Sequence, residues 1–235
     1  NGGSLRNAIP RESFALVTID TISKEAFLLE SNAHIQIIKE EFSTIERNLI
    51  IDITETTLPE KVMELDAQEG LLKSIYAAFN GVYRMSPDVA GLVETSNNIR
   101  VIVKNGQIKI GCLTRSSSET NKTDLANSLK SAFELSGFNV DLSGEYPGWQ
   151  PNIKSEILAI VSNLYENLHG EKAKVEACHA GLECGILGQN YPEMDMVSFG
   201  PTIRGAHSPD ERASISSTQK YWKFFIEILK NIPKK

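Results

Sequence analysis

The dipeptide Asn105-Gly106 is the feature that most restricts the fold of this chain. It lies between two apolar, β-branched stretches, residues 93–103 and 107–113. Asparagine followed by glycine accepts the positive φ angles of a type I′ turn, and such a turn joins two adjacent antiparallel strands. The sequence therefore predicts a β-hairpin, and with it an antiparallel sheet, near the middle of the chain.

Helical and strand patterns alternate on both sides of the predicted hairpin. Apolar residues recur at helical spacing in residues 23–46, 60–79 and 123–135. Short β-branched runs indicate strands at residues 14–21, 49–54 and 138–142. This order resembles the split βαβ arrangement of ferredoxin-like sandwiches. We therefore expect an α/β (α+β) fold in which helices cover one face of an antiparallel sheet.

The segment 145–152, EYPGWQPN, interrupts the periodicity with two prolines and a glycine. Such a composition is typical of a link between domains, so we divide the chain into residues 1–146 and 147–235. In the second part the pattern predicts a helix, a strand, a turn into a short helix, a strand and a final helix, at residues 153–168, 172–177, 179–185, 194–199 and 215–232. These elements make half of an α/β layered domain, which is too little to form a complete domain alone.

Composition and charge disfavour several classes of protein. The formal net charge of -6 argues against non-specific nucleic-acid binding. No apolar run approaches the length of a membrane span. The three cysteines are sparse and form no CxxC pair, which fits a reducing cytosol and argues against a structural zinc knot. The chain opens with Asn-Gly-Gly rather than methionine. That opening fits the C-terminal part of a longer protein, and equally a processed chain.

Residues 198–211, SFGPTIRGAHSPDE, form a candidate functional loop around His207. A histidine on a loop at the rim of an α/β sheet is placed where metal ligands and catalytic bases occur. The alternative is a histidine that only caps or packs, and the residues alone favour it because one histidine is not a site. Arg115 ends the second hairpin strand, where it either binds a carboxylate bidentately or covers the strand end.

Five motifs form a characteristic set: HAGLECG at residues 179–185, YPEMDMVSFGP at 191–201, GAHSPDE at 205–211, YPGWQP at 146–151 and NGGSLRNAIPRE at 1–12. In order and spacing they resemble the C-terminal half of the bacterial aminoacyl-histidine dipeptidases. These carnosinase-like Xaa-His dipeptidases belong to a dinuclear-zinc metallopeptidase family. The resemblance implies a cytoplasmic homodimer with a two-metal catalytic domain and an inserted lid. Residues 1–146 would be most of the lid, lacking its N-terminal part, and residues 147–235 the C-terminal segment of the catalytic domain.

The same resemblance assigns roles to four residues of this chain. His207 matches the C-terminal metal-ligand histidine. Arg115 matches the lid arginine that holds the C-terminal carboxylate of the dipeptide. Asn7 matches a lid asparagine that contacts substrate, and Gly181 a position whose backbone faces the substrate. The implied substrates are Xaa-His dipeptides of the carnosine type, and the implied cofactor is a pair of zinc ions.

The chain departs from the family in lacking the HxD motif, the catalytic Glu-Glu pair and the further aspartate ligand, which belong to an N-terminal half. The adjacent Glu40 and Glu41 do not replace that pair, because neighbours on a helix point about 100° apart. No residue of this chain is therefore assigned a catalytic role, and we expect the chain alone to be inactive. Two alternatives remain: a non-catalytic lid-like module for binding or dimerisation, and a ferredoxin-like domain that binds a small regulatory molecule.

Overall fold

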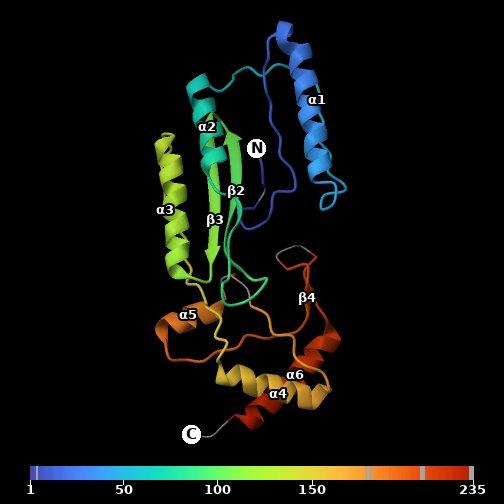
Figure 1. Ribbon diagram of the computed structural model, residues 1–235, viewed down its shortest axis with the longest axis vertical. Coiled ribbons are helices and arrows are strands. Elements are labelled where there is room, and N and C mark those ends of the chain that lie inside the picture. The colour runs from blue at the N-terminus through green and yellow to red at the C-terminus, as the bar shows by residue number, and fades with distance from the viewer. Residues whose placement is uncertain (4, 178, 180–181, 207–209, 233–235) are drawn as a thin grey trace. The chain divides into compact units, whose positions relative to one another are not determined.

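The computed structural model describes residues 1–3, 5–177, 179, 182–206 and 210–232 (Figure 1). Contacts within the chain divide it into two compact units. Unit 1 contains Asn1–Leu72 and Arg100–Gly111, and unit 2 contains Lys73–Ile99 and Cys112–Lys235. The division passes through both strands of the hairpin, so each unit takes part of it. The predicted boundary between residues 146 and 147 concerns a lid and a catalytic segment, and it stays a prediction.

The structure confirms the predicted hairpin. Strand β2 (Val93–Lys104) leads through a two-residue turn into strand β3 (Gln107–Ser116). In the turn, φ is 53° at Asn105 and 72° at Gly106. Both values are positive, as a type I′ turn requires, and asparagine and glycine are the residues that tolerate them.

Strand β1 (Gly81–Met85) runs antiparallel to β2, which gives the strand order β1-β2-β3. Gly81 lies opposite Asn97 and Met85 opposite Val93, with register shifts between them. The side chain of Asn97 also donates a hydrogen bond of 2.8 Å to the carbonyl of Phe79. This bond fixes the chain just before β1 and so sets where the strand begins.

In unit 1, the 3-10 helix η1 (Thr21–Ser23) leads into helix α1 (Lys24–Glu41), which buries Ile35. The strands predicted at residues 14–21 and 49–54 are wrong, because the structure has no strand there. Phe14 is 66% exposed and Leu16 is 61% exposed. β-branched sequence forms a strand only beside a hydrogen-bonded neighbour. Phe14 exchanges backbone hydrogen bonds with Asn1, and this contact is too short to make a strand.

Unit 2 places its helices largely as predicted. Helix α2 (Leu65–Ala77) crosses the division between the units. Helix α3 (Glu119–Leu135) buries Leu125, Leu129 and Phe133, which recur every four residues and so share one face. Phe133 meets Phe138 edge to face, with ring centroids 6.2 Å apart. The chain after α3 is thereby held against the helix, although it forms no strand at residues 138–142 as predicted.

Helices α4 (Glu156–His169) and α6 (Ile215–Asn231) pack against each other (Figure 1). Their shared core consists of Val161, Phe224 and Ile228. The hydroxyl of Ser155 accepts a hydrogen bond from the Leu158 amide and caps α4, and Gly170 ends it with a φ of 69°. The helix predicted at residues 153–168 is therefore present, but it begins three residues later than predicted because Ser155 caps it.

The rest of unit 2 consists of short elements and extended chain. Helix α5 (Glu183–Asn190) is followed by the two-residue strands β4 (Ile203–Arg204) and β5 (Arg212–Ala213), which pair antiparallel. The strands predicted at 172–177 and 194–199 are absent. The predicted class, mixed helices with antiparallel sheet, is confirmed. Among the described helices, none has the length and apolar character needed to cross a bilayer.

Candidate functional site

The structure describes two of the four residues to which the sequence assigns a role. Arg115 is half-buried near the end of β3, in unit 2. Asn7 is exposed in a turn of unit 1. Gly181 and His207 lie outside the described residues. The roles of all four therefore stay predictions. Of the predicted site, the surroundings of Arg115 are described in most detail.

Arg115 belongs to a buried polar region, which we call the polar hairpin base and define as residues 94–97 of β2 with residues 114–118. Thr95 is 0% exposed, and its hydroxyl lies 2.8 Å from that of Ser116. Thr114 donates a hydrogen bond of 3.1 Å to the side-chain carbonyl of Asn97, which is itself buried. Buried polar groups are tolerated only when they are hydrogen-bonded. The hydrogen bonds therefore fix the side chains of this region, which is shielded from solvent.

A carboxylate completes the polar hairpin base. Glu94 is buried, and its Oε1 accepts a hydrogen bond of 2.7 Å from Asn121 on α3. The same oxygen forms a 3.3 Å ion pair with Nε of Arg84 on β1. One carboxylate thus connects β1, β2 and α3. Removing either partner would leave a buried charge poorly compensated.

His179 is a part of this region that sequence reasoning missed. Its Nε2 lies 2.7 Å from the hydroxyl of Ser96 on β2. Burial lowers the pKa of His179 below its ordinary value, and the positive charge of Arg115 lowers it further. The imidazole is therefore neutral near neutral pH. The motifs around residues 94–97 and 178–184 gave no sign of this contact, because the two residues lie 83 positions apart.

The proline- and glycine-rich segment at residues 145–149 is held against the start of α3. The Gly148 amide donates a hydrogen bond to Glu119, and Lys122 donates one of 2.6 Å to the carbonyl of Tyr146. Burial raises the pKa of Glu119, but the Gly148 amide and Lys122 outweigh it, and the net direction is down. A Cβ on Gly148 would lie 2.7 Å from the carbonyl oxygen of Ser116. Only glycine therefore lets this segment approach the polar hairpin base.

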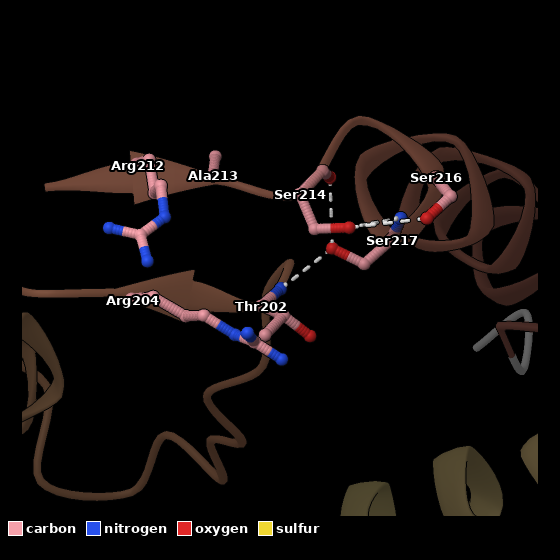
Figure 2. Close-up of a pocket in the computed structure, with 7 residues that line it drawn as sticks. All are labelled: Thr202, Arg204, Arg212, Ala213, Ser214, Ser216 and Ser217. Atoms are coloured by element: carbon pink, nitrogen blue, oxygen red, sulfur yellow. Dashed lines mark hydrogen bonds between the residues drawn. The ribbon is translucent and has the colours of Figure 1, made fainter.

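A shallow pocket lies where the β4–β5 hairpin meets the start of α6. Figure 2 shows its lining, with arginines from both short strands and serines from the first turn of the helix, namely Thr202, Arg204, Arg212, Ala213, Ser214, Ser216 and Ser217. Two of the serine hydroxyls are hydrogen-bonded. The Ser217 hydroxyl accepts a hydrogen bond of 2.9 Å from the Thr202 amide, and the Ser214 hydroxyl accepts one from the Ser217 amide. These hydrogen bonds therefore hold the chain just before β4 against the start of α6.

Comparison with known proteins identifies the family. The model of peptidase family M20/M25/M40 matches residues 19–231. The chain belongs to the M20 peptidase family.

Two relatives show how far the likeness extends. This M20 chain is 38% identical over 236 residues to the cytosol non-specific dipeptidase of Escherichia coli (strain K12), an alignment that covers 100% of the chain and 49% of the relative. The crystal structure of aminoacylhistidine dipeptidase from Vibrio alginolyticus is 39% identical, with a TM-score of 0.87, and the match covers 100% of this chain and 48% of that one. The chain thus spans about half the length of the relatives that it matches.

M20 enzymes are metal-dependent peptidases, but the described part of this chain does not supply a metal centre. Within the described ranges, no three His, Cys, Asp or Glu side chains come together as a metal site needs. The one ligand predicted from sequence, His207, lies outside those ranges. The described residues therefore do not fit a dinuclear site by themselves, and we derive no catalytic step from a metal here.

Proposed function

We propose that this M20 chain is the substrate-gripping part of a metal-dependent dipeptidase that hydrolyses Xaa-His dipeptides. Support comes from the likeness over the whole chain to two dipeptidases, one of which is named for aminoacylhistidine substrates. The structural observation that carries the proposal is the placement of Arg115, a half-buried residue of the polar hairpin base, where the carboxylate of Glu94 is already paired with Arg84 and Asn121.

Arg115 is suited to the carboxylate that every unmodified dipeptide carries. A guanidinium stays charged and presents paired N–H groups that match the two oxygens of a carboxylate. Its partial burial strengthens such a contact because water competes less. Asn7 and the backbone of Gly181 would add polar contacts to the rest of the dipeptide, as the sequence resemblance implies.

In the same proposal His207 provides one ligand to a pair of zinc ions, and the other ligands come from parts of the protein beyond this chain. The assembled protein is a cytoplasmic homodimer. Zinc suits this assignment because neutral imidazole is among its preferred ligands, and the ions supply Lewis-acid chemistry to peptide hydrolysis when bound. This chain would contribute substrate binding rather than the reacting groups.

The test is hydrolysis by the longer protein that contains this chain. We expect cleavage of β-alanyl-histidine and other Xaa-His dipeptides, loss of cleavage on treatment with a chelator, and recovery when zinc is restored. A matched panel of dipeptides without histidine shows whether the preference is narrow or broad, since one relative is named as non-specific. Full activity in the presence of chelator, or no cleavage of any dipeptide, contradicts the proposal.

A further inference from the structure

The register of the β2–β3 hairpin places Ser96 and Arg115 opposite each other. Side-chain hydrogen bonds join Thr95 to Ser116 at 2.8 Å and Asn97 to Thr114 at 3.1 Å. These pairs flank Ser96 and Arg115 on either side along the two strands. Because successive side chains of a strand point to opposite faces, Ser96 and Arg115 share the other face of the hairpin.

On that face the hydroxyl of Ser96 meets the ring of His179. Ser96 Oγ and His179 Nε2 lie 2.7 Å apart, and both groups are partly buried. All three residues belong to unit 2. The hydrogen bond ties His179 to β2, at the position that lies opposite Arg115 in the hairpin. Ser96 is a rigid anchor for the ring, since the side chains on either side of it in β2 are buried and hydrogen-bonded.

The uncharged state of the His179 ring is compatible with a neighbouring arginine that binds a carboxylate. Burial lowers the pKa of His179, and the charge of Arg115 lowers it further, so the imidazole is uncharged near neutral pH. A neutral ring fills space and forms hydrogen bonds through both nitrogens. Unlike an acid, it does not compete with the substrate for the guanidinium.

We propose that His179, held by Ser96, is a positioning residue that orients the Arg115 guanidinium toward the carboxylate of the dipeptide. The inference rests on the proposed function and deepens it. An arginine side chain has many rotamers, and ordering it costs entropy at the moment of binding. A fixed ring on the same face restricts those rotamers in advance. The pair therefore acts on substrate affinity rather than on the chemical step.

The test is steady-state kinetics of the longer enzyme with β-alanyl-histidine. Ser96→Ala and His179→Leu each remove the hydrogen bond, and we expect either to raise KM roughly five- to tenfold, with kcat changed by less than about twofold. His179→Gln keeps a polar group near the position of Nε2 and should recover most of the affinity. His34→Gln is the matched control: this exposed histidine lies on α1, in unit 1, and KM should not change.

A second readout shows whether the pair acts through Arg115. In an Arg115→Gln background, Ser96→Ala should change KM by less than about twofold, because there is no guanidinium left to orient. The same several-fold penalty in both backgrounds overturns the proposal. So does an unchanged KM in the single variants, or a loss of kcat that simply follows a fall in thermal stability. An inactive wild-type enzyme refutes the proposed function and this inference together. An active wild-type enzyme whose variants show an unchanged KM refutes the inference alone.

Discussion

Replacing Gly185 with alanine should destabilise the protein although the residue lies in a helix. Gly185 is buried in α5, and a Cβ built on it would lie 2.5 Å from the carbonyl oxygen of Pro147. Ordinary Cβ contacts begin at 3.4 Å. The opposing atom is backbone, so the segment must retreat by roughly 0.9 Å, and such overpacking costs about 1–3 kcal/mol.

Gly188 on the same helix is the matched control. A Cβ there meets only the flexible end of Met196, at 3.2 Å. Both substitutions gain the helix preference of alanine over glycine, about 1 kcal/mol. The difference between the two variants therefore isolates the contact with the segment at residues 145–149. We expect Gly188→Ala to be neutral or stabilising and Gly185→Ala to be less stable than it by about 1–3 kcal/mol.

Urea unfolding of the two variants of the longer protein, followed by tryptophan fluorescence, measures this difference from the transition midpoints at equal slope. If Gly185→Ala proved as stable as Gly188→Ala, the close approach of α5 to that segment would be wrong. The packing argument for the polar hairpin base would then lose its support on that side.

Three further predictions concern single groups in unit 2. The Ile157 amide, helped by nearby hydroxyl and amide donors, lowers the pKa of Asp195. The stability it adds is present above the unfolded carboxyl pKa of about 4 and is lost as pH falls through the lower folded value, so Asp195→Asn should flatten acid unfolding curves below about pH 4. Thr95→Val removes a fully buried hydroxyl and its hydrogen bond to Ser116, whose hydroxyl keeps the Ser118 amide as a partner; urea unfolding should show a loss of about 0.5–1.5 kcal/mol. Arg115→Gln removes a positive charge that lowers the pKa of His179, so NMR titration of the ring should show that pKa rising; an unchanged value would contradict their proximity.

Features set by neighbouring residues were predictable from the sequence. The Asn105-Gly106 turn needs only two positive φ angles, and both are present. Helices α3, α4 and α6 follow from apolar residues at helical spacing. Each of these signals acts within a few residues, so one sequence contains all that is needed to see it.

Features that need a distant partner were not predictable. Residues 14–21 have the composition of a strand, but a strand exists only where another backbone pairs with it. The contact between Ser96 and His179 joins positions 83 residues apart, and neither residue belongs to a recognisable pair in the sequence. The close approach at Gly148 likewise depends on the carbonyl oxygens of residues 116 and 117. The sequence showed a break there, but not that the break packs against the polar hairpin base.

The central claim is that Arg115 holds the carboxylate of the dipeptide, and one comparison tests it most directly. The longer enzyme and its Arg115→Gln variant should be assayed with β-alanyl-histidine and with the matched C-terminal amide, which lacks the carboxylate. We predict that the variant loses roughly 10- to 100-fold in kcat/KM for the dipeptide, mainly through KM, and less than about twofold for the amide. An equal loss on both substrates, or no loss on either, would contradict the account.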